Sequence, residues 1–576
     1  MVQPDIEAGA DGAEPSRGRP RLPRTDLGTF LLHWSMAIAM VLAMITGFRI
    51  AWDGANAVFS RLVAPILLQG DVWTIHFYAA LTMFGLASAY LVYLNRAALT
   101  GRNALARLRL LVVEAPARLK WQAFNVSMHW GFYLLTLAMM ATGILLYLGW
   151  GGLVVDIHAA LAIALVAYLV IHIVGHFMQG GWQQLLRIFL PARLVAGPLA
   201  KPRPLLAALA IGAIASIAIA AMDLGTRDRL VAPKIAVAPV LDGELDDPAW
   251  KGMVPARVRT QQGFNLAGGR GESLVEIRAA HDGDTIYFAF RWQDPTRSLK
   301  RLPVIKRADG WHLLHNHADI ADESAYYEDK FAVLFARTDA FGGGVTHLGP
   351  KPLDTLPGAL NGRGLHYTTD GSYADMWQWK ASRGGHLGKV DDMHFGPPYP
   401  ANARQQAGTE RYSAGYLQDP GKAFYAYNYK GEPPGGYRGP VTVPRLPKDY
   451  RAIVARMGTI NLDVNVSDDE GAQWWMFEAE TLPYSAELDA AIPVGTVLPG
   501  VIIGGTYEGD RADVSAAPKW KDGWWTLEAK RSLKGSGSKF DIDFTEGKPV
   551  YLWVSVFDHN QTRHTRHVRG VRLDIR

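Results

Sequence analysis

Six histidines lie within long apolar stretches in the first 180 residues of this 576-residue chain. They are His33, His76, His129, His158, His172 and His176. A neutral imidazole offers a nitrogen lone pair, and histidine is the commonest metal ligand in proteins. The chain has no cysteine, which excludes thiolate ligands, iron–sulfur clusters and thioether attachment of a prosthetic group. Any bound metal must therefore be held by His, Met, Lys or carboxylate side chains.

The stretches around these histidines are long enough to cross a membrane, since a hydrocarbon core of about 30 Å takes about 20 helical residues. Five segments meet this length: Leu27–Ile50, Val72–Leu94, Phe124–Leu148, Ile157–Met178 and Pro204–Met222. An ionisable side chain within such a span is costly and by default marks a functional site. Taken singly, each histidine could instead form a hydrogen bond between two helices. The depths of the six histidines in the membrane must decide between this alternative and a functional site.

Depth depends on topology, and topology follows from the short loops, because Lys and Arg accumulate on the cytoplasmic side. The second and fourth loops carry clusters of Arg and Lys, whereas the first has only Arg61 and the third, residues 149–156, has none. We therefore predict a disordered cytoplasmic tail at residues 1–26 and a multi-pass protein of the bacterial inner membrane. Everything after Met222 is expected in the periplasm.

In this topology His33 lies near the cytoplasmic end of the first span and His76 near the outer end of the second. His158 and His172 lie at opposite ends of the fourth span, where 14 residues correspond to about 21 Å along a helix and about 40° around it. We predict two pairs, His33 with His172 and His76 with His158. Two bis-imidazole sites stacked across a bilayer suit electron transfer through haem, because six-coordinate iron exchanges electrons without opening a substrate site.

One His near the start of each of the first two spans, with a His-x13-His pair on the fourth, resembles the di-haem cytochrome b membrane subunits. These include bacterial cytochrome b561 and the cytochrome b subunits of periplasmic hydrogenases and formate dehydrogenases. The resemblance implies a four-helix di-haem domain at residues 27–200, two haem b groups and exchange with quinone. His129 could contact a propionate or a quinone head group, and His176 is a rival ligand to His172. The fifth span, 204–222, has no His and is predicted to be a tether.

From Lys234 onward the sequence changes to short alternating runs. These are Val275–Ala280, Thr285–Trp292, Lys330–Phe335, Trp474–Glu480, Trp524–Lys530 and Tyr551–Phe557. Period-two alternation of β-branched and aromatic residues, broken by Gly, Pro and Asp, predicts an antiparallel sandwich. The predicted fold class is thus an all-α transmembrane helical bundle followed by an all-β, sandwich-like extracytoplasmic domain at residues 228–576. The interval Phe341–Asp449 has little periodicity and is predicted to be a functional loop system.

Four motifs characterise this second region. Val240–Trp250 resembles the first strand of sandwich domains that bind sugars or haem, and is predicted to be a strand. The others are Tyr327-Glu328-Asp329-Lys330-Phe331-Ala332-Val333, Ala374-Asp375-Met376-Trp377-Gln378-Trp379-Lys380-Ala381 and a terminal His564-x-x-His567. These three together narrow the choice, because they resemble the haem-b-binding γ subunits of ethylbenzene dehydrogenase and dimethylsulfide dehydrogenase. The resemblance spans about residues 235–576 and implies a third haem b, held in the sandwich by a Lys and a Met.

The resemblance gives Lys380 as the amine ligand. Desolvation beside aromatic residues would lower its pKa toward the neutral amine that iron needs, although a lysine extended over Trp379 at a strand end is the alternative. The Met ligand has no counterpart, because Met376 is only four residues from Lys380. His347, in a loop that resembles Cys-x-x-Cys-His without its cysteines, is predicted in its place, with His366 as the alternative. The group His312, His315, His317, Asp319 and Asp322 could hold another metal.

These features predict a membrane-bound b-type cytochrome that carries electrons between the quinone pool and a periplasmic redox protein or enzyme subunit. No catalytic constellation, phosphate loop or carboxylate pair stands out, so no catalytic residue is predicted. The net charge of +5 includes the loops that set topology and gives no indication of a nucleic-acid partner. Two rival interpretations are a membrane-anchored sandwich that binds a ligand without a redox role, and a quinol-dependent reductase of a small periplasmic acceptor.

Overall fold

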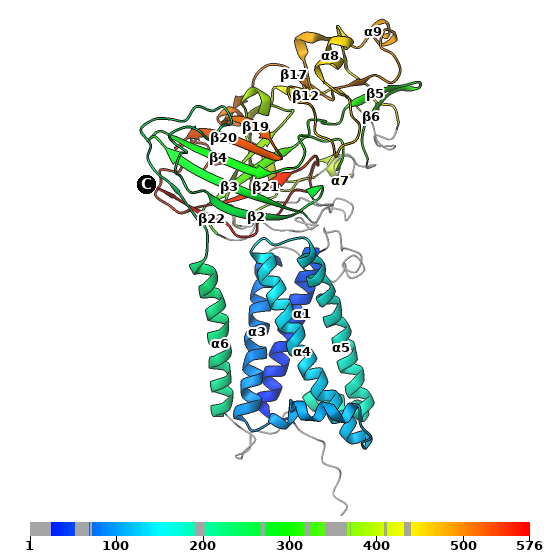
Figure 1. Cartoon of the computed structure of the whole chain (residues 1–576), viewed down its shortest axis with the longest axis vertical. Helices are drawn as coiled ribbons and strands as arrows, with labels where there is room; N and C mark the ends of the chain where they lie inside the picture. Colours follow the sequence, from blue (N-terminus) through cyan, green and yellow to red (C-terminus); the bar gives the residue numbers. More distant parts are fainter. Residues whose placement is uncertain are drawn as a thin grey trace, which may run out of the picture. The chain divides into compact units, whose positions relative to one another are not determined.

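The structure is a computed structural model, and it describes residues 25–51, 68, 72–189, 202–266, 271–316, 323–339, 366–368, 370–407, 412–430 and 439–576. His347 and nearly all of the predicted tail at 1–26 lie outside these residues. The described part begins with long apolar helices and continues as a β-rich region with several sheets (Figure 1). The predicted fold class is therefore confirmed.

Five of the described helices are long and apolar enough to cross a membrane. They are α1 (Leu27–Ala51), α3 (Val72–Arg96), α4 (Ala117–Tyr147), α5 (Leu153–Leu186) and α6 (Pro202–Gly225). The helices α4 and α5 run well beyond the predicted spans, because backbone hydrogen bonding continues into polar flanks that end an apolar window. Two glycines, Gly180 and Gly181, interrupt α5 with non-helical backbone angles.

The fifth span does more than connect the two regions. At Gly212, α6 approaches α3 so closely that an added Cβ would lie 2.4 Å from the carbonyl oxygen of Gly85. The hydroxyl of Ser216 donates to the carbonyl oxygen of Leu81 at 3.1 Å. Small residues of this kind let membrane helices pack backbone to backbone, so α6 is packed against α3.

The β-rich region contains a seven-stranded and a five-stranded sheet. The first has the order β1 (Arg229–Ala232), β22 (Val571–Ile575), β21 (Val550–Phe557), β7 (Lys330–Ala336), β8 (Ala374–Lys380), β9 (Asp391–Phe395) and β10 (Tyr416–Gln418). The second has the order β19 (Ser515–Lys521), β20 (Trp524–Ser532), β4 (Thr285–Gln293), β3 (Gly271–His281) and β2 (Ala256–Gly263). Within these two sheets all described strand pairs are antiparallel except β1 with β22.

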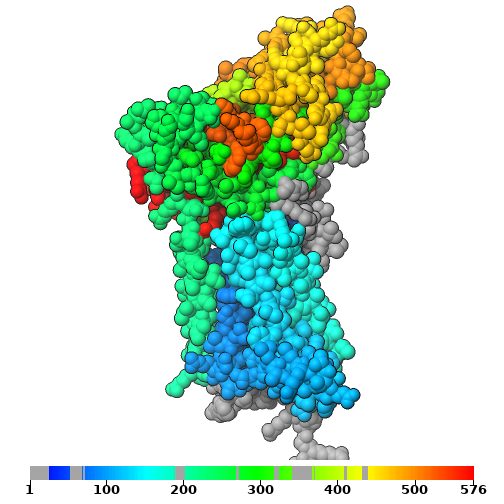
Figure 2. Space-filling model, in the orientation of Figure 1, coloured from blue at the N-terminus to red at the C-terminus, as the bar shows by residue number. Residues whose placement is uncertain are grey.

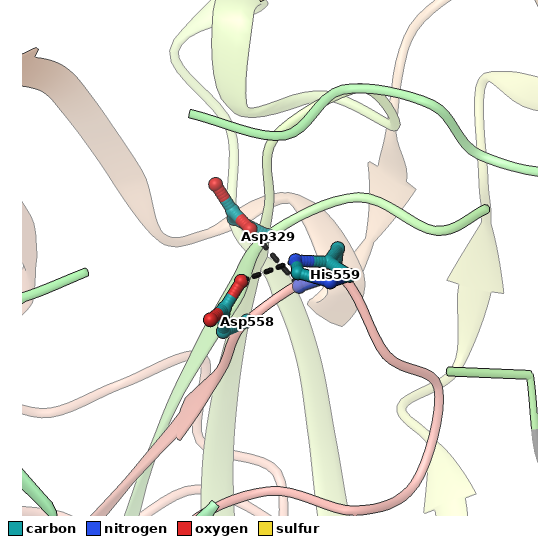
Figure 3. A group of neighbouring side chains, drawn as sticks. All are labelled: Asp329, Asp558 and His559. Atoms are coloured by element: carbon teal, nitrogen blue, oxygen red, sulfur yellow. Dashed lines mark hydrogen bonds and ion pairs between the residues drawn. The ribbon is translucent and has the colours of Figure 1, made fainter. Parts of the chain in front are cut away.

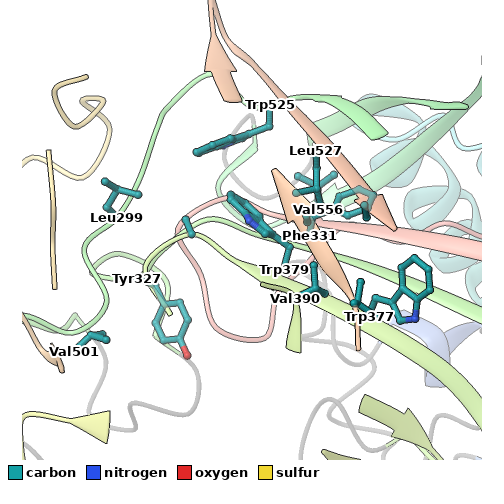
Figure 4. Packing of buried hydrophobic residues seen from close by; sticks show 14 of the residues in the cluster. Leu299, Tyr327, Phe331, Trp377, Trp379, Val390, Val501, Trp525, Leu527 and Val556 are labelled. Carbon is teal, nitrogen blue, oxygen red and sulfur yellow. The ribbon is translucent and has the colours of Figure 1, made fainter. Parts of the chain in front are cut away.

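The two sheets face each other across an aromatic core (Figure 4). The ring of Trp292 on β4 stacks on Phe331 of β7 with centroids 4.4 Å apart. The rings of Trp379 on β8 and Trp525 on β20 lie 4.8 Å apart, edge to face. Aromatic pairs across two sheets bury large apolar areas and fix the register of the sheets, which makes this region a β-sandwich.

Short elements lie outside the two large sheets, and several of them, α8 and α9 among them, gather in a lobe beside the sandwich (Figures 1 and 2). The short strands are β5 (Val304–Arg307), β6 (Gly310–Leu313), β11 (Gly421–Lys422), β12 (Tyr425–Tyr427), β13 (Arg445–Pro447), β14 (Met476–Phe477), β15 (Thr481–Pro483), β16 (Val497–Leu498), β17 (Val501–Ile503) and β18 (Glu508–Gly509). The short helices are α7 (Ala403–Gln406), α8 (Tyr450–Arg456) and α9 (Ala486–Ala490). The interval predicted as loop, 341–449, thus contains strands, which are mostly too short to show periodicity.

Two predicted strands are wrong. Val240–Trp250 forms no strand, because the carboxylate of Glu528 accepts the backbone N–H groups of Asp242 and Gly243 at 3.0 and 2.8 Å and holds this segment as a loop. Within Trp474–Glu480, only Met476–Phe477 is strand, and a 3₁₀ turn, η10 (Glu478–Glu480), follows. Consecutive buried residues at 474–476 show that burial there comes from both sides and not from one face of a strand.

Candidate functional site

The predicted ligands His76 on α3 and His158 on α5 have matching surroundings. Their Nδ1 atoms lie 3.1 Å from the hydroxyl of Thr46 and 2.8 Å from the hydroxyl of Thr142. Each hydroxyl donates to the carbonyl oxygen four residues earlier in its own helix, at 2.7 and 2.8 Å. The hydroxyl oxygen must therefore accept from the imidazole, so Nδ1 carries the proton and Nε2 keeps the lone pair that binds a metal.

A glycine follows each of these threonines, and an imidazole packs against each glycine. A Cβ added to Gly47 would lie 3.0 Å from Cε1 of His76, and one added to Gly143 would lie 3.6 Å from Cε1 of His158. Sequence reasoning missed this support, although the repeated Thr-Gly dipeptide in α1 and α4 was a visible signal.

The second predicted pair, His33 on α1 and His172 on α5, is brought together. Their ring centroids lie 6.3 Å apart with an interplanar angle of 27°. Metal–imidazole bonds are about 2.0–2.1 Å long, so two imidazoles on opposite sides of one metal have centroids about 6 Å apart. The Nδ1 atoms of both residues are buried and lack a hydrogen-bond partner within the described residues. This spacing fits one iron atom.

The two remaining membrane histidines lie beside this pair. His176 has its ring 4.7 Å from that of His172 at an angle of 82°, so it stays close enough to be a rival ligand. His129 donates from Nδ1 to the carbonyl oxygen of Arg102 at 3.0 Å, and its ring meets Tyr90 edge-on at 6.3 Å. The loop between α3 and α4 thus fixes the orientation of His129.

In the sandwich, Lys380 lies opposite Lys330 in the register of β8 and β7. The ammonium of Lys380 forms an ion pair with Asp391, whose carboxylate also binds Arg511 at 2.7 Å. Its neighbour Lys330 donates to a backbone carbonyl at 2.7 Å and lies 4.0 Å from the ring centroid of Phe557. Burial, followed by nearby cations, lowers the pKa of Lys330 well below its usual range. Lys330 is thus the better source of a neutral amine here.

Two histidines lie on the same sheet face as these lysines. The ring of His366 stacks on Phe395 at 4.8 Å and lies 6.4 Å from the ring of His564, whose other neighbour is Phe557 at 4.8 Å. The Nδ1 of His564 donates to the carbonyl oxygen of Thr565 at 2.7 Å, which leaves Nε2 as the nitrogen for a metal. Burial lowers the pKa of His564 to about 4, so the ring is neutral at pH 7.

This face of the seven-stranded sheet carries a cluster of buried apolar side chains. Its buried residues are Ala332, Leu334, Ala336, Ala374, Met376, Met393, Phe395, Trp553 and Phe557. Three of these residues are alanines, which lie on the adjacent strands β7 and β8, and Met376 and Met393 carry sulfur atoms. The face therefore combines a flat apolar surface with side chains that could supply a nitrogen or sulfur ligand.

The other predicted metal group is not assembled in the described residues. His312 pairs through Nε2 with Asp309 at 2.9 Å, and His317, Asp319 and Asp322 lie outside them. A different cluster joins Asp329, Asp558 and His559 (Figure 3). There the carboxylate of Asp329 already accepts three N–H groups, at 2.7, 3.1 and 3.2 Å. These bonds make the cluster a structural link between β7 and the segment after β21.

Long apolar helices that carry buried histidines, followed along the chain by a β-sandwich, are the architecture expected of a membrane-bound haem protein. Residues 24–191 match the family model described as prokaryotic cytochrome b561, and residues 247–569 match the one described as ethylbenzene dehydrogenase. The second match covers more than half of the chain, which belongs to the ethylbenzene dehydrogenase family. The chain is a membrane b-type cytochrome of electron transfer with haem b in its membrane domain, and both resemblances are confirmed.

No curated protein matches the chain significantly. Among solved structures, a family 9 carbohydrate-binding module from Caldicellulosiruptor kristjanssonii in complex with cellotriose is 10% identical, with a TM-score of 0.20, over 60% of this chain and 93% of that one. A putative carbohydrate-binding protein from Bacteroides uniformis is 8% identical, with a TM-score of 0.23, over 61% of this chain and all of that one.

Proposed function

We propose that this chain carries electrons between the quinone pool and a periplasmic redox protein or enzyme subunit, by way of two membrane haems and one haem b in the sandwich. The observation that carries the proposal is the geometry of His33 and His172, together with the matched support of His76 and His158. Haem b supplies reversible one-electron chemistry when bound.

The residues of the chain have distinct roles in this proposal. His33 with His172, and His76 with His158, hold the two membrane haems. Thr46 and Thr142 fix the ring orientation and proton of His76 and His158, as partners of metal-bound imidazoles commonly do. His129 and His176, which lie beside His33 and His172, are candidates for contacts with a propionate or a quinone head group.

The third haem would lie against the apolar face formed by β7, β8, β9 and β21. Lys380 and His347 are the ligands predicted from the sequence. The spacing of His366 and His564, 6.4 Å between centroids, is close to that of the membrane pair and supports these two as an alternative pair. Lys330 is the further candidate, because its amine is buried without a carboxylate partner in the described residues.

The membrane ligands are tested by measuring haem per protein and visible spectra of the full-length protein in detergent. We expect His158→Ala and His172→Ala each to remove one haem, and the matched control His312→Ala, outside all three sites, to leave the ratio unchanged. If His176→Ala loses a haem and His172→Ala does not, the ligand is His176, one helical turn after His172. If neither His158→Ala nor His172→Ala changes the ratio, the proposed pairs are wrong.

The sandwich ligands are tested in the same protein by the spin state of its third haem. Replacing a true axial ligand by Ala should shift that haem from low spin to high spin, so Lys380→Ala, Lys330→Ala, His347→Ala, His366→Ala and His564→Ala are compared. Lys380→Arg should behave as Lys380→Ala does, because a guanidinium stays protonated. Spectra that no variant alters would mean that none of these five residues is a haem ligand.

A further inference from the structure

Three aspartates from distant parts of the sandwich converge at one edge. Asp392 is on β9, Asp513 follows η11 (Asp510–Ala512), and Asp541 lies in the connection between β20 and β21. One carboxylate oxygen of each lies within 4.8 Å of the others. Two oxygens bound to one Ca²⁺ at 2.3–2.6 Å can be no more than about 5 Å apart. The spacing therefore allows one ion to contact all three.

The carboxylates at this edge are buried and short of donors. The side chains of Asp392 and Asp541 are 0% and 1% exposed, and that of Asp513 is 20% exposed. Six buried carboxylate oxygens here have no hydrogen-bond donor among the described residues: Asp375 Oδ1, Asp392 Oδ2, Asp419 Oδ2, Asp513 Oδ1, Asp513 Oδ2 and Asp541 Oδ1. Buried acceptors without partners are rare in folded proteins and call for a ligand or a proton.

The nearest cation does not balance this charge. The guanidinium of Arg531 donates to Asp375 at 2.7 Å and to the carbonyl oxygen of Ile542 at 2.7 Å. Its nitrogens are 3.7 Å from Asp392 and Asp541 and 4.0 Å from Asp513, beyond hydrogen-bonding distance. One arginine thus faces four carboxylates, and burying unpaired charge is strongly unfavourable.

We propose that Asp392, Asp513 and Asp541 bind a divalent cation of the calcium class. The donor set consists only of carboxylate oxygens, which suits Ca²⁺, Mg²⁺ or Mn²⁺ and not the nitrogen- and sulfur-preferring metals. The three carboxylates offer four oxygens without a donor among the described residues, and water molecules would complete the six to eight ligands that Ca²⁺ takes. The partial exposure of Asp513 gives the ion a route from solvent. The site ties β9, the start of β19 and the β20–β21 connection together.

A shared proton is the competing way to stabilise these carboxylates. Burial raises the pKa of Asp392 well above its usual range and that of Asp513 to about 6, so protonation would satisfy the cluster in acid. The two cases differ at pH 7.5. A cation site then binds Ca²⁺ and is stabilised by it, whereas a proton-sharing cluster is indifferent to Ca²⁺.

The test uses the full-length protein in detergent, stripped with EDTA and dialysed into calcium-free buffer at pH 7.5. We measure bound Ca²⁺ by equilibrium dialysis and the thermal midpoint as Ca²⁺ is added. We expect one more Ca²⁺ per chain than in Asp392→Asn or Asp541→Asn, and a midpoint that rises with Ca²⁺ in the wild type alone. Asp294→Asn, which alters a buried carboxylate outside this site, is the matched control and should respond as the wild type does.

Asp513→Asn is the variant that should keep the fold, because Asp513 is partly exposed. We expect it to weaken Ca²⁺ binding at least 10-fold. Chelation should lower the wild-type midpoint without changing haem content, which separates this site from the haem proposals. The proposal would be overturned if the wild type bound no Ca²⁺, or if all three variants bound Ca²⁺ as well as the wild type does.

Discussion

At the scale of single residues, two threonines are the least expected part of the candidate site. Each lies one position before a glycine on one helix and orients an imidazole on another, so the pattern repeats in α1 with α3 and in α4 with α5. A bound metal needs its imidazole held in one tautomer, and a hydroxyl that already donates to a carbonyl can only accept. Thr142 therefore decides that Nδ1 of His158 carries the proton, while for His76 Thr46 acts together with the carbonyl oxygen of Ala43, which lies 3.0 Å from Nδ1.

Replacing Thr142 by Val should remove this acceptor while keeping the shape of the side chain. Loss of a partner of a metal-bound imidazole typically costs about 10- to 100-fold in affinity, so we expect haem to be lost from this site by dilution or competition with apomyoglobin. The control Thr142→Ser keeps the hydroxyl and should retain haem. Equal retention in both variants would show that the threonine does not act on the ligand.

The two glycines should respond differently to alanine. A Cβ on Gly47 would lie 3.0 Å from the ring of His76 and force it to move, whereas one on Gly143 would lie 3.6 Å from His158, an ordinary van der Waals contact. We expect Gly47→Ala to reduce the haem-to-protein ratio and Gly143→Ala to leave it unchanged. The reverse order would mean that the rings shift when haem binds.

At the scale of elements, local patterns predicted well what local forces determine. Apolar windows predicted all five long helices, and period-two alternation predicted β3, β4, β7, β20 and β21. The segment Val240–Trp250 could not be predicted, because Glu528 holds it from far along the chain. The same holds for the pairing of Lys380 with Asp391 and for the three aspartates of the cation site, which meet only after the sandwich forms.

The strand β21 also depends on a histidine that titrates. The N–H of Val554 donates to Nδ1 of His567 at 3.1 Å, and burial lowers the pKa of His567 to about 4. Between pH 6.5 and 4 the unfolded chain binds the proton and the folded chain does not. The free energy of unfolding therefore falls as the pH is lowered through this range, by at most about 3 kcal/mol.

His567→Asn keeps an acceptor for Val554 but cannot titrate. We expect the thermal midpoint of the full-length variant to fall less than that of the wild type between pH 7 and pH 4.5. The thermal midpoint of each protein at pH 7.5 is the reference from which its fall at lower pH is measured. An identical pH dependence would mean that other groups account for the acid sensitivity.

At the scale of the whole molecule, the proposal depends on which side of the membrane holds the sandwich. The Arg and Lys residues of the second and fourth loops predict a cytoplasmic N-terminus, and five spans then bring the C-terminus to the periplasm. Alkaline phosphatase fused after Arg576 should be active, and a cytoplasmic reporter at the same position inactive. The opposite result would exclude a periplasmic partner.

The histidine pairs are a prediction from the topology of the spans together with spacing, because 14 residues along one helix fix both the depth and the face of His158 and His172. Their supporting residues and the third site do not follow from spacing, because these depend on how the helices and sheets pack. The chain is a membrane b-type cytochrome by its match to prokaryotic cytochrome b561, and the arrangement of its haems is a proposal.

The most direct test of that arrangement is the number of haem b groups per chain, measured by pyridine haemochrome against amino-acid analysis on the purified full-length protein. We expect three, two in the bundle and one in the sandwich, all non-covalent because the chain has no cysteine. A ratio of two that His158→Ala and His172→Ala each lower would remove the sandwich haem from the account. A ratio of one or less would contradict its central claim.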